Sequence, residues 1–183
     1  ENYKKVVLLL NVGNIIDMTD INRIAPDSVL YVWQGGMTGG KGTADVLTGK
    51  VSPSGKLPDT IAYKASDYPS DANFGREKNR DIYAEDIYVG YRYFETFAKE
   101  KVLYPFGFGL SYTEFEIKTE KAEITEGAVK LSVSVKNIGS YKGKEVIEVY
   151  CEAPQGRLGK AARVLCGFEK TRELVPQEEQ VVE

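Results

Sequence analysis

The chain has 183 residues, of which 42% are hydrophobic, 28% charged and 11% aromatic, a composition typical of globular proteins. Its net charge of -3 gives no electrostatic reason to expect a nucleic acid or an anionic membrane as a partner. Its longest apolar run, residues 6–10, is far shorter than the roughly 20 residues that a membrane-spanning helix needs. We therefore expect no nucleic acid and no membrane among its partners.

Histidine is absent, which excludes Ser-His-Asp and Cys-His catalysis and most zinc sites from this stretch. The two cysteines, Cys151 and Cys166, are too few for a disulfide framework, and both lie in expected strands, so we predict buried free thiols. Residues 1–5 are polar and do not resemble a signal peptide. If they are the true start of the protein, a cytoplasmic location is favoured over a secreted one.

The first 60 residues alternate between strand and helix patterns. Residues 6–10 (Val-Val-Leu-Leu-Leu) form a continuous apolar run, typical of a strand buried on both faces of a parallel sheet. A short helix is predicted over residues 20–24, with Thr19 or Asp20 as its N-cap. Residues 28–33, rich in β-branched and aromatic side chains, predict the next strand.

A glycine-rich loop is predicted over residues 35–42, followed by a short helix over residues 44–47 that Gly49 closes. The segment from Gly35 to Thr43 approximates a phosphate-binding loop and follows a strand, as such loops do. A nucleotide-binding protein is therefore one alternative. Against it, the helix is short, and no apolar strand ending in a magnesium-binding Asp follows. A tight turn with close helix packing is the simpler interpretation of the glycines.

Residues 60–108 have few periodic signals but many Tyr, Asp, Asn and Arg residues, which indicates a long ordered loop or linker. The following region alternates cleanly between apolar and polar residues. Strands are predicted around residues 129–135, 145–151, 164–168 and 180–182. Short strands with turns between them are typical of a β-sandwich. The last of them ends the chain as an apparently unpaired strand, which favours truncation at the C-terminus.

Three blocks of sequence resemble glycoside hydrolase family 3, the family of many β-glucosidases. The first covers residues 33–58 and includes Ala-Asp-Val-Leu and Pro-Ser-Gly-Lys-Leu-Pro, a pattern of the family's late α/β sandwich. The second covers residues 86–94 and 104–113 and resembles the bridge into the family's C-terminal domain. The third, residues 135–170, is similar to its fibronectin-III-like domain. The blocks occur in the family's order.

The resemblance implies a fold and a division of the chain. The fold class is α/β followed by all-β: a partial α/β sandwich with a mostly parallel sheet, then a fibronectin-III/immunoglobulin-like β-sandwich. The implied parts are residues 1–60, the end of the α/β sandwich; residues 61–112, a bridging loop segment; and residues 113–183, a truncated fibronectin type III-like domain.

The resemblance also implies a retaining exo-acting β-glycosidase that hydrolyses terminal non-reducing β-D-glucosyl residues without a metal or an organic cofactor. Such hydrolysis needs two carboxyl groups, and the family's nucleophilic Asp and acid/base Glu lie in motifs that are absent here. The chain itself is therefore expected to be an inactive scaffold. Tyr83 and Glu85 occupy positions where the family has Tyr-x-Glu-Gly, which makes them candidates for the substrate-binding rim. Asp86 stands in place of the usual Gly.

The expected partners are a β-linked glucoside or oligosaccharide and a TIM-barrel domain of the same protein, before or after this segment. Homo-oligomerisation is left open. A second alternative, besides nucleotide binding, is a stand-alone carbohydrate-binding module.

Overall fold

The structure, a computed structural model, describes residues 3–183, and these form two compact units. Unit 1 consists of the chain up to Thr43 together with Leu57–Phe108 and Cys151–Val164; unit 2 consists of Ala44–Lys56, Gly109–Tyr150 and Leu165–Glu183. Among the described residues, no helix is both long enough and apolar enough to cross a membrane.

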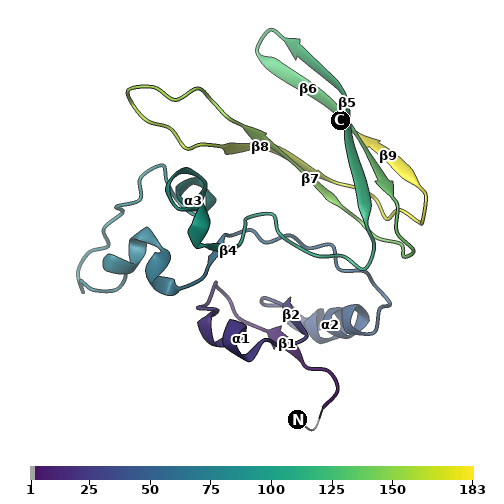
Figure 1. Cartoon of the computed structure of the whole chain (residues 1–183), viewed down its shortest axis with the longest axis horizontal. Coiled ribbons are helices and arrows are strands. Elements are labelled where there is room, and N and C mark those ends of the chain that lie inside the picture. Colours follow the sequence, from purple (N-terminus) through teal and green to yellow (C-terminus); the bar gives the residue numbers. More distant parts are fainter. Residues whose placement is uncertain (1–2) are drawn as a thin grey trace. The chain divides into compact units, whose positions relative to one another are not determined.

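Unit 1 contains a parallel strand pair, as the sequence predicts. Strands β1 (Val7–Leu10) and β2 (Ser28–Tyr31) pair in parallel, and helix α1 (Thr19–Ile24) connects them (Figure 1). The prediction that β1 is buried on both faces is wrong for this chain. Only Leu10 is fully buried, in a cluster with Met18 and Ile61, because this cluster covers one face of the pair.

The N-cap predicted for α1 is also wrong. Met18 is the N-cap residue, and its own side chain makes no capping hydrogen bond. Instead, the Asp17 carboxylate accepts hydrogen bonds from the backbone N–H groups of Thr19 (2.8 Å) and Ala65 (2.9 Å). Hydrogen bonds from the Thr19 side chain and these amides lower the pKa of Asp17 to about 2. Asp17 thereby connects the start of α1 to a distant segment of the same unit.

The glycine-rich segment is helical rather than a loop. A short 3-10 helix covers Gly36–Thr38, and α2 begins directly at Gly39 and runs to Leu47. Gly35 lies so close to Gly39 that a Cβ atom on it would be 2.6 Å from the Gly39 Cα atom. The interpretation as a phosphate-binding loop is therefore wrong, because a helix here replaces the loop that would wrap around phosphate.

The segment predicted as a long loop contains regular structure. Strand β3 (Ile61–Ala62) pairs antiparallel with β4 (Val102–Tyr104), and α3 spans Tyr91–Phe97. Three 3-10 helices complete the segment: Ala65–Asp67, Pro69–Ala72 and Lys99–Lys101. Phe94, 1% exposed, packs with Ala62 and Ala98 and meets the Tyr68 ring edge-on. This small core holds α3 against β3.

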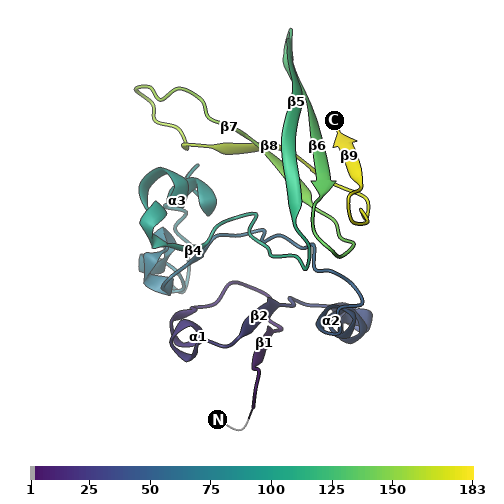
Figure 2. The same ribbon diagram turned by 45° about the vertical axis from the view of Figure 1, so that its right-hand side comes forward.

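The predicted β-sandwich is confirmed in the second half of the chain. Strands β5 (Phe115–Thr125), β6 (Ala128–Asn137) and β9 (Glu179–Val182) form one antiparallel sheet, and β7 (Val146–Cys151) and β8 (Val164–Lys170) form a second (Figure 2). Buried residues from both sheets make one core: Val133, Val135, Ile147, Leu174 and Val182. The fold class, α/β and then all-β, follows from these two parts.

Two details of the sandwich differ from expectation. The terminal strand β9 is paired, with Val182 opposite Val133, so the premise of an unpaired last strand is wrong, and truncation stays a prediction. Neither cysteine is in a disulfide, as predicted, but both are exposed rather than buried.

Candidate functional site in unit 1

The carboxyl ends of β1 and β2 lie side by side, the place where parallel α/β sheets commonly bind ligands. Two aromatic rings lie at the end of β2. The ring centroids of Tyr31 and Trp33 are 4.4 Å apart, and the Tyr31 hydroxyl donates a 2.6 Å hydrogen bond to the carbonyl of Asn14. Trp33 has φ 57°, a left-handed conformation that a bulky residue rarely adopts. Such strain is concentrated at functional sites.

Asp59 lies in the same unit, directly before β3. It is half-buried, and this burial raises the pKa of its carboxyl. Burial likewise raises the pKa of both Tyr31 and Tyr68, and the negative charge of Asp59 adds to each increase. The next residue, Thr60, is 2% exposed, and within the described part of the chain its hydroxyl has no hydrogen-bond partner. A carboxylate, a hydroxyl and aromatic rings therefore gather near this edge.

Tyr68 fixes the backbone around these polar groups. Its hydroxyl donates to the Thr60 carbonyl (2.8 Å) and accepts from the Ala62 N–H group (2.9 Å). Because the Tyr68 ring also packs on Phe94, the segment that carries Asp59 is held by both a hydrogen-bonding and an apolar contact. The backbone of this site is thus well supported.

Tyr83 and Glu85, the residues predicted from sequence, lie on a turn of the same unit. Tyr83 is 92% exposed, Glu85 is half-buried, and the Tyr88 N–H group bonds to the Glu85 carbonyl at 2.9 Å. The segment ends at Gly90, where an added Cβ atom would lie 3.7 Å from the Asp59 carboxylate. Within residues 3–183, no hydrogen bond or ion pair joins Tyr83 or Glu85 to Asp59, so their role at the rim stays a prediction.

Asp86, at the position where the family pattern has Gly, adopts a left-handed backbone conformation. Its φ is 50°, in the left-handed region that Asp tolerates better than branched residues. We expect Asp86→Val to lower the free energy of unfolding by about 1–2 kcal/mol, because a β-branched side chain is strained there, whereas Asp86→Gly is tolerated. Urea denaturation measures both. Asp81→Val, at a neighbouring exposed position with ordinary φ, is the control, and an equal loss there would contradict this explanation.

Among the residues that the structure describes, no three Asp, Glu or Cys side chains are arranged to hold a metal ion. The site consists of aromatic faces, one carboxylate and hydroxyl groups. These groups suit a neutral, hydroxyl-rich ligand, because hydroxyls donate to carboxylates and apolar ring faces pack on the carbon skeleton.

Residues 1–112 match the Glycosyl hydrolase family 3 C-terminal domain, which is more than half of the chain. The chain belongs to glycosyl hydrolase family 3. The family 3 chain is 65% identical over 182 residues to a "Beta-glucosidase" of Ruminococcus albus, and 48% identical over 200 residues to "Beta-glucosidase A" of Butyrivibrio fibrisolvens. Both alignments cover 100% of this chain, but only 19% and 24% of the relatives.

Solved structures agree with this family 3 fold. A β-glucosidase from Paenibacillus barengoltzii superposes with a TM-score of 0.92 at 54% identity, covering 98% of this chain and 20% of that one. β-Glucosidase 3B from Thermotoga neapolitana, in complex with α-D-glucose, gives 0.89 at 41% identity, with 98% and 25% covered. The chain thus spans about a fifth to a quarter of the length of these relatives.

The sequence interpretation missed Asp59 and Trp33. Asp59 follows Pro58 at the start of an apolar strand, where a charged residue about to be buried is unusual, and that position was the available signal. Trp33 offered no comparable signal, because its left-handed backbone arises only in the folded chain.

Proposed function

We propose that this chain is the non-catalytic scaffold of a retaining, exo-acting β-glucosidase that hydrolyses terminal non-reducing β-D-glucosyl residues. The observation that carries the proposal is the 65% identity, along the whole chain, to a protein named β-glucosidase. At this level of identity we expect the two proteins to share their scaffold: the α/β strands, the Pro-Ser-Gly-Lys-Leu-Pro segment at residues 53–58, and the β-sandwich. The proposal includes no metal and no organic cofactor.

The two catalytic carboxylates would lie outside residues 1–183, on a TIM-barrel domain and on an earlier loop of the α/β sandwich. Retaining hydrolysis requires these groups about 5 Å apart, one as nucleophile and one as acid/base. Tyr83 and Glu85 would contribute to the rim of the active site. Exposure of the Tyr83 ring supports this assignment, because an exposed aromatic face can pack on a sugar.

The test compares the full-length protein with the 183-residue chain. The full-length protein is expected to release glucose from cellobiose and from a 4-nitrophenyl β-D-glucoside but not from the α-glucoside, with the β-anomer of glucose formed first. The isolated chain is expected to be inactive and to show no cellobiose binding by calorimetry. The proposed function would be rejected if the open reading frame encoded no TIM barrel. It would also be rejected if the full-length protein did not hydrolyse β-glucosides.

A further inference from the structure

We propose that Asp59, beside the Tyr31–Trp33 ring pair, is a sugar-binding residue whose carboxylate accepts hydrogen bonds from hydroxyl groups of the bound glucoside. This inference rests on the proposed β-glucosidase function and adds to it a residue from the scaffold. Three observations support it: the surroundings of Asp59, the adjacent Thr60, and the geometry at the carboxyl end of β2.

Asp59 is a half-buried carboxylate without a protein partner. Across residues 3–183 it makes no hydrogen bond or ion pair, and the change in its pKa has burial as its cause, with no compensating contact. Three other carboxylates of the unit do have partners: Asp17 with two backbone amides, Asp27 with Lys5, and Asp67 with Lys101. A desolvated charge without a partner costs stability, and such groups are found mainly where a ligand supplies the partner.

Thr60, the next residue, also has a polar side chain without a hydrogen-bond partner among the described residues. Its hydroxyl is buried, and within the part of the chain described it lacks a partner, although most buried polar atoms in proteins have one. Its carbonyl is already bonded to Tyr68, so the backbone is satisfied while the side chain is not. Two consecutive polar side chains therefore have free hydrogen-bonding capacity on a rigid segment.

The chemistry of the surroundings favours a neutral polyol. Tyr31 and Trp33 provide aromatic surface at the carboxyl end of β2, and Trp33 holds its strained backbone at φ 57°. Ligand sites typically combine such apolar walls with a few oriented polar groups. The backbone at Gly90, whose φ of 58° and ψ of -128° suit only glycine, lies beside Asp59, because an added Cβ atom there would be 3.7 Å from the Asp59 carboxylate. Burial and the negative charge of Asp59 both raise the pKa of Tyr31, so the carboxylate also lies near this ring.

The experiment uses the full-length protein and Asp59→Asn, which keeps the shape of the side chain and removes its charge. We expect KM for cellobiose and the inhibition constant for glucose to rise about tenfold or more, the loss associated with one hydrogen bond to a charged group. The turnover number should change much less, because the Asp59 hydrogen bond would stabilise the bound substrate and the transition state equally, and its loss weakens both by the same amount. Asp71→Asn, at an exposed position of the same unit, is the control and should leave both constants unchanged.

A thermal unfolding curve separates binding from a structural role. Asp59 has a raised pKa when folded, so its charge opposes folding above the ordinary pKa of Asp, and the Asn variant should unfold at the same or a higher temperature at pH 7. That difference should vanish as the pH falls below about 4, where the unfolded Asp also protonates.

Unchanged KM and glucose inhibition in Asp59→Asn, with an active wild type, would overturn the inference and leave the β-glucosidase function intact. A lowered unfolding temperature with unchanged KM would also overturn it, because Asp59 would then be paired with a cation elsewhere in the protein. Asp59→Glu, which keeps the charge but displaces it, should also raise KM, and a normal KM there would count against hydroxyl recognition. A wild type without β-glucosidase activity would remove both proposals.

Discussion

Replacing Asn137 by Leu is expected to lower the free energy of unfolding by about 3–4 kcal/mol, since several buried groups lose their partners together. Asn137 is fully buried at the end of β6. Its side-chain oxygen accepts from the Thr113 hydroxyl (2.7 Å) and the Gly139 N–H group (3.1 Å). Its amide donates to the carbonyls of Tyr141 (2.7 Å) and Leu174 (2.9 Å). One side chain therefore joins three loops of the sandwich.

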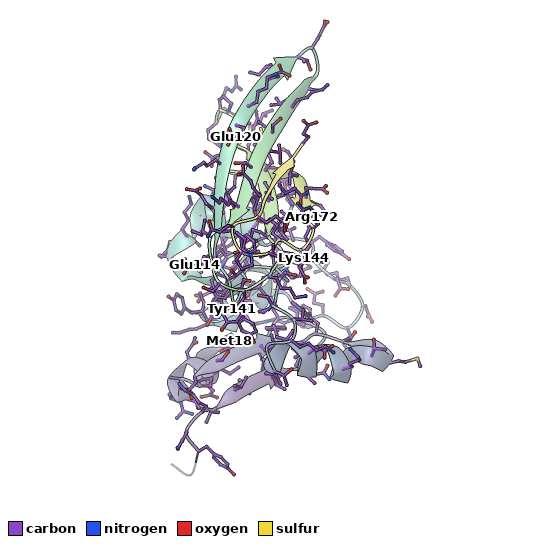
Figure 3. All side chains as sticks on the ribbon, turned by 90° about the vertical axis from the view of Figure 1, so that its right-hand side faces the viewer. Met18, Glu114, Glu120, Tyr141, Lys144 and Arg172 are labelled. Carbon is purple, nitrogen blue, oxygen red and sulfur yellow. The ribbon has the colours of Figure 1, made fainter. Side chains whose placement is uncertain are left out.

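Urea denaturation measures this loss, and Ser134→Ala is the matched control. Ser134 is also buried on β6, but it makes one side-chain hydrogen bond, to Glu120, which extends from β5 (Figure 3). Water can replace Ser134 as a partner of Glu120, so the control should cost no more than about 1 kcal/mol. Equal costs for the two variants would show that the Asn137 network does not determine the loop arrangement.

The second large effect concerns Lys56, the lysine of the Pro-Ser-Gly-Lys-Leu-Pro segment. Its ammonium group lies 2.7 Å from the Glu145 carboxylate and donates to the Gly109 carbonyl at 3.0 Å, and the two charged side chains are only 18% and 15% exposed. Gly109 leaves no room beside Gly55, where an added Cβ atom would be 2.2 Å from the carbonyl oxygen. The ion pair thus fixes a closely packed crossing of two segments in unit 2.

We expect Lys56→Met to cost about 3 kcal/mol, because it leaves the Glu145 carboxylate buried without its cation. Adding Glu145→Gln should recover part of this loss, since the amide oxygen still accepts from the Val146 N–H group without a charge. A double-mutant cycle on the exposed pair Lys142–Glu173 (2.9 Å) is the control, with an expected coupling of about 0–1 kcal/mol. Similar coupling in both pairs would contradict a special role for Lys56.

The sequence predicted the sandwich strands well where one face is buried and the other is exposed. In β6, Val133 and Val135 alternate with polar residues, and this alternation is visible in the sequence. Strand β5 was missed, although it is the longest, because nearly all of its eleven residues are exposed and five of them are charged. A register irregularity between Thr119 and Lys121 also interrupts its alternation. Its strand conformation comes from pairing with β6.

Helices were harder to predict because local preference and tertiary structure disagree. The first residues of α2 include three glycines, which disfavour helix, and a Cβ atom added to any of these three would meet no neighbouring atom within 4 Å. Helix α3 has seven residues and buries only Phe94 completely, so it has no amphipathic period to detect. Phe94 packs on Ala62 and Tyr68, so α3 depends on contacts with segments distant in sequence.

Some residues of the candidate site were predicted from the sequence, and others were not. Tyr83 and Glu85 came from resemblance to a family pattern, and the structure places them on one turn of unit 1. Asp59 was not predicted: its position after Pro58 was the one signal in the sequence, and being half-buried without a partner is a property of the folded chain. Family membership was predictable because three blocks of sequence, within residues 33–170, resemble the family's motifs and occur in the family's order.

The central claim is that the catalytic residues lie outside residues 1–183, and covalent labelling tests this claim most directly. Retaining glycosidases form a covalent glycosyl-enzyme intermediate, which a 2-fluoro-β-glucoside inactivator can trap on the nucleophile. After inactivation of the full-length protein, proteolysis and mass spectrometry should find the glucosyl label on a carboxylate outside residues 1–183. A label on any Asp or Glu within these residues would contradict the scaffold role proposed for this chain.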